Sequence, residues 1–268
     1  MSAKKTKNVE VSVNVADEVL TLNRASAIFS SLVKILAVQR NQIPFSYQTF
    51  SLLVNRVRQD DEDASKEGSW KAFQVEKQRD LAKNTVQDYE KFLKMIQIGF
   101  ENSVQEAVIL FGATIFTPKE IWHVEFPKDM KTNFWSTRNS QQAVDQIVSA
   151  IGFHKQLWES FSRQLLPTNM YLMLKIDESK TISQGFLEMF TKNEDFTIPG
   201  RCPVSKITIQ NNLTESAMGN QFLDLSFLGD VLHRSPEKKT ENCQWYECDV
   251  SVKGFKDVLV KGKSIWNL

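Results

Sequence analysis

The stretch Ile35 to Tyr47 reads Ile-Leu-Ala-Val-Gln-Arg-Asn-Gln-Ile-Pro-Phe-Ser-Tyr and marks the end of a helix and the start of an extended segment. Apolar residues recur at helical spacing before and within it, at Ala25, Ile28, Phe29, Leu32, Ile35 and Leu36. This spacing places one apolar face on a helix of about five turns, which Asn23 can cap. Pro44 cannot continue a helix and favours an extended Ile43, so the helix is expected to end inside the stretch.

Strand and helix patterns follow one another irregularly along the rest of the chain. Valines at every second position from Val9 to Val15 predict a strand, because such alternation is typical of a half-buried strand. Two further helical patterns run from Trp70 to about Ser103 and from Ser140 to Leu166, before Pro167. Further strands are expected at Val108–Phe111, Ile121–Phe126, Met170–Ile176, Val204–Ile209, Phe222–Phe227 and about Tyr246–Val252, with a turn at Thr117–Glu120. Met170–Ile176 is almost continuously apolar and is expected to be a central strand.

This element order predicts an α+β fold, with three helices packed on one face of a mainly antiparallel sheet. Strict alternation of strands and helices, which would indicate a parallel sheet, is missing. We expect a short tail over residues 1–8 and a single domain over residues 9–268. Two loops interrupt the domain, an acidic one at 59–69 and a longer one at 177–203. The acidic run at 60–63 lacks calcium-loop spacing and is interpreted as a solvated linker.

The composition argues against several classes of protein. The 33 basic and 32 acidic residues nearly cancel, so no overall basic field favours nucleic-acid binding. The longest apolar run, Ala107 to Phe116, is far shorter than the roughly 20 residues that span a bilayer, and no membrane association is expected. Three cysteines and no secretory signal in view favour free thiols and a reducing compartment.

Catalytic and metal-binding patterns are missing from the sequence. Neither a phosphate-binding glycine loop nor a nucleophile elbow or zinc-protease motif occurs. None of His123, His154 and His233 has a cysteine or second histidine at metal-ligand spacing. Cys243 and Cys248 are expected on opposite faces of one strand. We therefore expect no catalytic residue, no metal and no cofactor, and a protein that is not an enzyme.

Three short segments carry a resemblance to a known family. Val38–Tyr47 is similar to the motif Tyr-Gln-Arg-Gln-Gln-Leu-Pro-Leu-Pro-Tyr of the comet family, the Mad-two-binding HORMA proteins of the spindle checkpoint. Val108–Gly112, followed by Thr117–Glu120, resembles the family's Ile-Leu-Leu-Gly-Gly and Ser-Pro-Lys-Glu. Val252–Phe255 resembles its C-terminal Thr-Phe-Lys-Gly-Phe. The segments occur in the family's order and span most of the chain.

The resemblance implies a HORMA-like fold with a C-terminal safety-belt-like region, here residues 229–268. In the family the chain's own C-terminal segment occupies the site where other HORMA proteins bind a peptide. By this analogy Gly254 and Phe255 belong to a built-in pseudo-ligand, which would be held by backbone hydrogen bonds at a sheet edge.

The resemblance also implies a function. The family binds the closed conformer of the checkpoint protein Mad-two, blocks its templated conversion, and presents it to an AAA+ ATPase of the Pch-two/thyroid-receptor-interactor-thirteen type. By this analogy the chain is a non-catalytic adaptor that silences the mitotic checkpoint. It would work in nucleus and cytoplasm, and at the spindle or kinetochore in mitosis. Lys192 and Asn193 lie in the loop region that contacts the ATPase in the family.

Four residues on two helices would form the partner-binding face by the same resemblance. Gln39 and Arg40 stand at the end of the first helix, and Val148 and Ile151 lie on the third. Val148 occupies the position of an interface phenylalanine in the family, so the anchor is smaller here. Without a role in partner binding, Gln39 would be a solvated helix-end glutamine and Val148 an ordinary core residue.

Two rival functions follow from the same sequence. The first is a HORMA scaffold of another pathway, autophagy initiation or the meiotic axis, that binds a peptide through its belt. The second is an enzyme of unknown type, which would require a deep pocket lined by converging titratable groups.

Overall fold

The computed structural model describes residues 8–15, 20–60, 70–128, 130, 140–211, 242–259, 264 and 266. Its strands are β1 (Val9–Val15), β2 (Val104–Gly112), β3 (Pro118–Glu125), β4 (Asn169–Asp177), β5 (Phe190–Lys192), β6 (Val204–Asn211), β7 (Cys243–Cys248) and β8 (Val252–Lys253). Its helices are α1 (Leu22–Gln39), α2 (Tyr47–Asp60), α3 (Trp70–Phe100), α4 (Ser140–Gly152), α5 (Lys155–Phe161) and α6 (Gln184–Leu187). The fold is α+β, as the sequence predicts.

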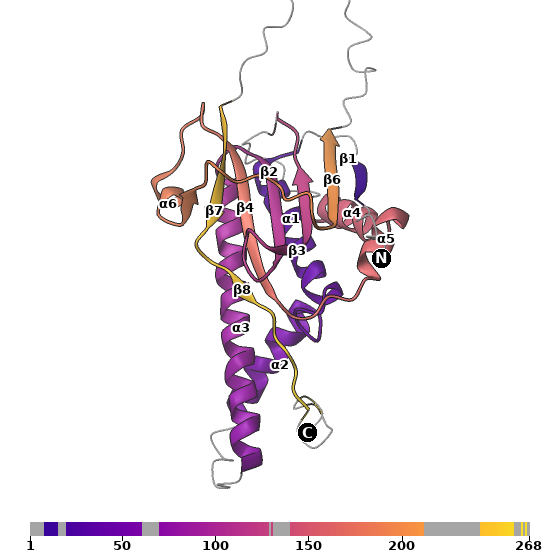
Figure 1. Cartoon of the computed structure of the whole chain (residues 1–268), viewed down its shortest axis with the longest axis vertical. Helices are drawn as coiled ribbons and strands as arrows, with labels where there is room; N and C mark the ends of the chain where they lie inside the picture. Colours follow the sequence, from indigo (N-terminus) through magenta and orange to yellow (C-terminus); the bar gives the residue numbers. More distant parts are fainter. Residues whose placement is uncertain are drawn as a thin grey trace, which may run out of the picture.

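One sheet collects all of these strands in the order β1-β6-β3-β2-β4-β7-β5, with β8 pairing with the beginning of β4 (Figure 1). Strands β2, β3, β4, β5, β7 and β8 pair antiparallel, whereas β6 runs parallel to both β1 and β3. The sheet is therefore mainly antiparallel, as expected, with one parallel portion at the β1 edge. Strand β4 lies inside the sheet, which confirms the prediction for Met170–Ile176.

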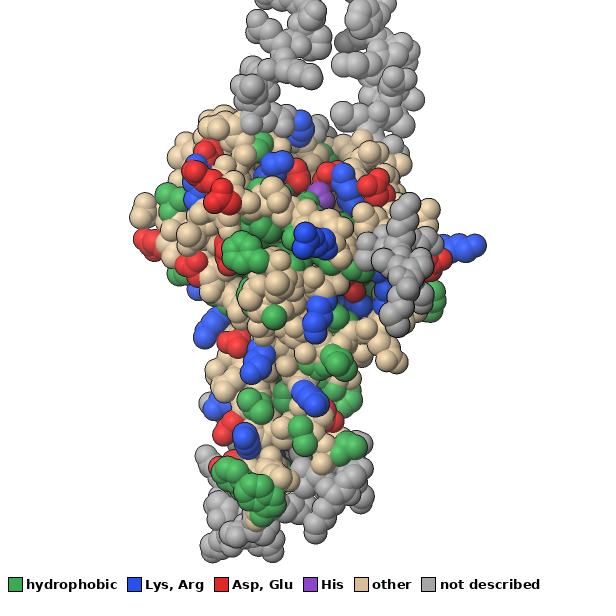
Figure 2. All heavy atoms as spheres, viewed as in Figure 1, with side chains coloured by type: hydrophobic (Ala, Val, Ile, Leu, Met, Phe, Trp, Pro, Cys, Tyr) green, Lys and Arg blue, Asp and Glu red, His purple; other side chains and the backbone are tan. Residues whose placement is uncertain are grey.

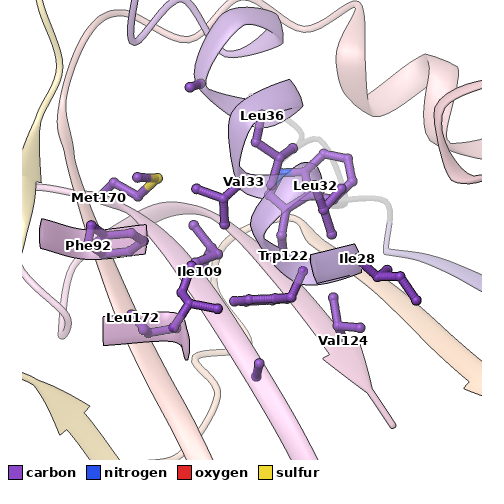
Figure 3. Close-up of a cluster of buried hydrophobic side chains, with 14 of the residues drawn as sticks. Ile28, Leu32, Val33, Leu36, Phe92, Ile109, Trp122, Val124, Met170 and Leu172 are labelled. Carbon is purple, nitrogen blue, oxygen red and sulfur yellow. The ribbon is translucent and has the colours of Figure 1, made fainter. Parts of the chain in front are cut away.

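Helices α1 and α3 cover one face of the sheet, and α3 continues beyond the sheet beside α2 (Figure 1). Alternate residues of each strand point into the layer between them, because successive side chains of a strand face opposite sides. Ile109, Trp122 and Leu172 from three strands meet Leu32 and Val33 of α1 there (Figure 3). Burial of this single large cluster provides most of the hydrophobic stabilisation of the domain.

The opposite face of the sheet carries a smaller apolar cluster. Val108, Leu110, Ile121 and Met173 are fully buried under Phe196 and Cys202. The chain between β5 and β6 therefore covers this face, and Phe196 contacts Trp245 edge-on with ring centroids 5.1 Å apart. The predicted 177–203 loop is thus partly ordered, since it also contains α6 and β5.

Three predictions about local structure were wrong. Asn23 lies inside α1, and Thr21 caps this helix instead. The single helix expected over Ser140–Leu166 is broken into α4 and α5 at Phe153, because His154 caps α5 with its Nδ1 accepting from Gln156 N–H at 3.4 Å. The expected turn at Thr117–Glu120 lies earlier, since β3 already begins at Pro118. The three expected helices are accompanied by α2, α5 and α6 in the described part of the chain.

Several expectations concern residues outside the described ranges. These are the tail up to residue 7, most of the acidic loop, the strand expected at Phe222–Phe227, and the part of the belt up to residue 241.

Candidate functional site

A groove of about 1090 Å³ runs over the solvent-facing side of α1. Its floor is α1, one wall is α4, and the other wall is formed by α3 and the beginning of α2. The lining residues are Asn23, Ser26, Ala27, Ser30, Ser31, Lys34, Ile35, Val38, Gln39, Ser46, Tyr47, Gln48, Gln97, Glu101, Gln141, Val144, Asp145 and Val148. Hydroxyl and amide groups dominate this set, so the groove offers many neutral hydrogen-bonding groups around a short apolar strip.

The amphipathic sequence of α1 accounts for the floor of the groove. Its apolar stripe, including Ile28, Leu32 and Leu36, is buried in the core, so the small residues between them face outward. Ala27, Ser30 and Ser31 are only half-buried, and their short side chains keep the floor low. A partner's backbone can come closer to a helix whose contact residues are small.

The four predicted partner-binding residues divide into two pairs. Gln39, at the end of α1, is exposed, and Val148 on α4 is half-buried, and both line the groove. Arg40 and Ile151 are each only 1% exposed and belong to the interior of the domain. The structure therefore offers Gln39 and Val148 to a partner, whereas Arg40 and Ile151 present no surface in this conformation.

The end of α1 is shaped by Asn41, which adopts φ 54 and thus a left-handed conformation. The N–H of Asn41 donates to Val38 O at 2.9 Å, and the N–H of Gln42 donates to Ala37 O at 2.8 Å. These two bonds form a Schellman motif, in which asparagine takes the place usually filled by glycine. The turn reverses the chain at once and directs the next residues into the protein.

Arg40 holds together three distant parts of the chain. Its guanidinium forms a buried ion pair with Glu120 and donates to the carbonyls of Ser160 and Phe161, each at 3.2 Å, and of Arg163. The other oxygen of Glu120 accepts from Trp122 Nε1 at 2.6 Å. The arginine thus supplies donors to the carbonyl end of α5 and a counter-charge to a carboxylate on β3.

Gln42 extends the same network to the C-terminal segment. Its Oε1 accepts from Thr168 N–H at 2.8 Å, and its backbone oxygen accepts from Phe255 N–H at 2.7 Å. Gly254 N–H donates to Thr168 O at 2.8 Å. Asn41 also reaches Leu165 O through Nδ2 at 3.5 Å. We call Arg40, Asn41 and Gln42 the α1 hub, because they join the end of α1 to these segments.

The C-terminal segment is fixed by aromatic packing as well as by hydrogen bonds. Phe255 and Trp266 lie against Phe50 of α2, with ring centroids 5.4 and 5.6 Å from that ring. Trp266 also meets Phe45 edge-on at 6.2 Å. Gly254 and Phe255, predicted as a pseudo-ligand segment, are therefore held against the domain next to β8, by both main-chain bonds and rings.

Lys192 and Asn193, predicted as an ATPase-contacting loop, lie at the β5 edge of the sheet. Lys192 is 41% exposed and forms an ion pair with Glu178 at 2.9 Å, which raises the pKa of its amino group. The Asn193 N–H donates to Trp245 O at 2.9 Å. Neither residue lines the groove, so they belong to a different surface.

One cluster on the outer face of the sheet could hold a metal ion. Donor atoms of Glu106, His123 and Glu125 lie within 4.8 Å of one another. Both carboxylates already form ion pairs with lysines. Lys175 lies 2.8 Å from Glu106, and Lys206 lies 2.8 Å from Glu125. Acidic and basic side chains interleave over this face in Figure 2. The cluster is therefore a neutralised charge network, and sequence reasoning missed it because its members come from different strands.

The protonation of this cluster is set by its neighbours. Burial alone would raise the pKa of Glu106, but hydrogen bonds from His123 and Lys175 lower it to about 2.

Burial raises the pKa of the Cys248 thiol to about 12, so this thiol is a poor nucleophile at neutral pH. All three cysteines are free, as expected.

Within the described residues, the large groove does not gather titratable groups into a catalytic arrangement. Its charged lining residues are Lys34 on α1, Asp145 on α4 and Glu101 directly after α3, and none is ion-paired with another among the described contacts. Neutral hydrogen-bonding groups and a few apolar side chains make up the rest of its lining.

Two comparisons with known proteins found no match. No protein-family model matches the chain, and no curated protein sequence is significantly similar to it. Among the described helices, none has both the length and the apolar character that crossing a bilayer requires.

Sequence reasoning missed most of the groove and the α1 hub. The signal for the floor was present in the small polar residues that separate the apolar positions of α1, such as Ser30 and Ser31. An asparagine directly after a helix is a local signal for the left-handed end at Asn41. The role of Gln42 had no local signal, because Thr168 and Phe255 lie far along the chain.

Proposed function

We propose that this protein is a HORMA-type adaptor that binds the closed conformer of Mad-two through the groove over α1. It blocks templated conversion of further Mad-two and presents the bound conformer to an AAA+ ATPase of the Pch-two type, which silences the mitotic checkpoint. Preference for one conformer of a two-state partner is sufficient to bias that partner's equilibrium. ATP hydrolysis belongs to the ATPase, and this chain contributes binding.

The observation that carries this proposal is that Gln39 and Val148 line the same groove. They come from α1 and α4, which are distant in sequence, and the resemblance to the comet family assigns both to the partner interface. The pairing of a helix-end amide with an apolar side chain agrees with a mixed interface, where apolar contacts provide affinity and hydrogen bonds provide orientation.

The C-terminal segment supports the adaptor over a scaffold that binds a peptide. Gly254 and Phe255 directly follow β8 and are hydrogen-bonded to Thr168 and Gln42. The chain's own C-terminal segment therefore uses these backbone groups. A separate peptide would have to displace these bonds and the contact between Phe255 and Phe50. Recognition through the helix groove requires no such displacement.

The test is binding of purified closed Mad-two to the full chain by isothermal titration calorimetry. Gln39→Ala combined with Val148→Glu is expected to weaken binding at least about 30-fold, since interface anchors typically contribute about 2 kcal/mol or more. Ser30→Arg, which would place a long side chain on the groove floor, provides an independent block. Gln87→Ala, at an exposed position of α3 outside the groove, is the matched control and is expected to bind normally.

Thermal unfolding separates loss of binding from loss of fold. Gln39 is exposed, so Gln39→Ala alone is expected to melt like the wild type. Wild-type affinity in the double variant and in Ser30→Arg would show that the groove is not the interface. A wild-type chain that fails to bind closed Mad-two would refute the proposed function itself.

A further inference from the structure

The projecting part of α3 carries exposed apolar side chains near its beginning. Trp70, Phe73 and Leu81 are 72%, 54% and 42% exposed. The rings of Trp70 and Phe73 stack with centroids 5.6 Å apart, so the two side chains form one apolar surface. Figure 2 shows hydrophobic side chains gathered at this end of the molecule. Contiguous apolar side chains at a surface indicate a contact site, whereas single scattered ones do not.

These side chains belong to a stripe along α3 that is distinct from its buried face. At about 100° per residue, the exposed residues of the stripe fall within an arc of about 100°. We call this arc the α3 stripe; it consists of Trp70, Phe73, Lys77, Asp80, Leu81 and Asn84. The buried residues of the same stretch lie on another side of the helix; they include Gln78, Ala82, Thr85 and Val86. The α3 stripe is therefore not the side by which α3 packs on its own domain.

The spacing within the α3 stripe is that of a helix–helix contact. Its members recur every three or four positions, which places them one above another on one face of the helix. An apolar helix face is stable when another element covers it, and a second helix is the simplest cover. The stripe also carries one lysine and one aspartate, Lys77 and Asp80, so its occupant has to match both charges.

A second copy of the same stripe meets these requirements when the two helices run antiparallel. With the two-fold axis at Lys77, Phe73 of each copy lies opposite Leu81 of the other. Lys77 is then displaced from Asp80 of the other copy by three residues, about 4.5 Å along the helix. Each lysine thus has a carboxylate of the other copy beside it, and two equivalent ion pairs flank the axis. The stripe is therefore complementary to itself in its apolar pattern and in its charges.

This arrangement also keeps the two domains apart. It overlaps residues 70–84 of each copy, about 21 Å of helix. Tyr89 and Phe92, where the side chains of α3 are fully buried in their own domain, then lie beyond Trp70 of the other copy. The contact is short, and short interfaces give weak, concentration-dependent association.

We propose that two copies of this chain associate through the α3 stripe, antiparallel and two-fold symmetric about Lys77. Trp70, Phe73 and Leu81 form the apolar contact, and Lys77 with Asp80 fixes the register by reciprocal ion pairs. None of these residues lines the groove over α1, so the inference does not rest on the proposed function. A dimer of this kind carries two such grooves, which strengthens binding to any partner that presents two copies of its own surface.

The first test is sedimentation velocity of the full chain between about 2 and 300 µM. The wild type is expected to dimerise with a dissociation constant of about 10–100 µM, as fits a small interface. Phe73→Glu puts a charge into the apolar contact and is expected to weaken association at least about tenfold. Phe116→Glu is the matched control, because Phe116 is 75% exposed in the turn between β2 and β3 and lies outside the stripe. It is expected to dimerise like the wild type.

The second test exchanges the charges of the stripe. Lys77→Glu places a carboxylate beside Asp80 of the other copy and is expected to weaken association about fivefold or more at low salt. Adding Asp80→Lys reverses both charges and is expected to restore association to within about twofold of the wild type. Each variant should keep the circular dichroism and the thermal unfolding of the wild type, because both positions are exposed.

Three results would overturn this inference. A wild-type chain that is monomeric at every concentration excludes association, even where Phe73→Glu loses binding to Mad-two. Unchanged dimerisation in Phe73→Glu shows that another surface is used. Failure of the charge exchange to restore association excludes the antiparallel register.

Discussion

Gln39 and Arg40 are neighbours in the sequence, yet they belong to different parts of the molecule. Gln39 is exposed at the end of the groove, whereas Arg40 is buried in the α1 hub and bonded to β3 and to the end of α5. Gln39 is the last residue of α1, and Arg40 is its C-cap, directly before the left-handed Asn41. A short motif of this kind can therefore combine an exposed residue with a buried structural one, and the two need different experiments.

The largest effect is expected from breaking the hub. Arg40→Met should lower the free energy of unfolding by about 3–5 kcal/mol, because it leaves the Glu120 carboxylate buried without its counter-charge. Urea unfolding followed by circular dichroism measures this change. Gln39→Ala is the neighbouring control and should change stability by less than about 0.5 kcal/mol.

The double variant Arg40→Met with Glu120→Met separates loss of the pair from exposure of an unpaired charge. It should regain part of the lost stability, since removing both charges avoids the buried carboxylate. An Arg40→Met protein as stable as the wild type would show that the hub does not hold the fold together.

Lowering the pH tests the partly exposed cluster of Glu106, His123 and Glu125 on the outer face of the sheet, whereas the substitutions above test the buried hub. The pKa of Glu106 is about 2 in the folded chain against an ordinary 4.5, so its contribution to stability is complete above about pH 4.5. That contribution is lost as the pH falls toward 2, and we expect it to be about 2 kcal/mol after solvent screening. Glu106→Gln should remove this part of the pH dependence, as measured by urea unfolding at pH 7, 4 and 3. An unchanged pH profile in this variant would contradict the role of the cluster.

A smaller effect is expected where the C-terminal segment meets the hub. A Cβ at Gly254 would clash with Gln42 Oε1 and would lie 2.9 Å from both N and O of Thr168. Gly254→Ala should therefore cost about 1–2 kcal/mol and raise the hydrogen-exchange rates of Phe255 and its neighbours. Gln42→Ala in the same chain relieves only the side-chain contact, so it should not restore the wild-type rates. Unchanged exchange in Gly254→Ala would show that the segment is not held by this contact.

The sequence predicted the elements better than it predicted the site. Alternating valines and the apolar run from Met170 to Ile176 identify strands because burial on a sheet imposes a period of two or continuous apolarity. The break at Phe153 escaped notice because Trp158 and Phe161 continue a helical spacing across it. In the folded chain Leu157, and not Trp158, is buried, so the apparent stripe was not the packed one.

The parallel pairing of β6 with β1 and β3 could not be predicted in this way, since a periodic pattern shows which residues face the core and not which strands pair. Gln39 and Val148 were identified as candidates through resemblance, and the fold supplies the groove that both of them line. The cluster of Glu106, His123 and Glu125 depends entirely on register between β2 and β3, which a single sequence does not contain.

The α1 hub also has a consequence for the order of folding. Its bonds join residues separated by 80, 120 and 126 positions along the chain. Contacts of such long range require large loops to close before they stabilise anything, and they slow folding. Helix α1 can form early from local interactions, but Arg40 acquires its partners only after β3 and the end of α5 have reached it, and Gln42 only after Thr168 has done so. The end of α1 is therefore expected to be among the last parts of the domain to become native.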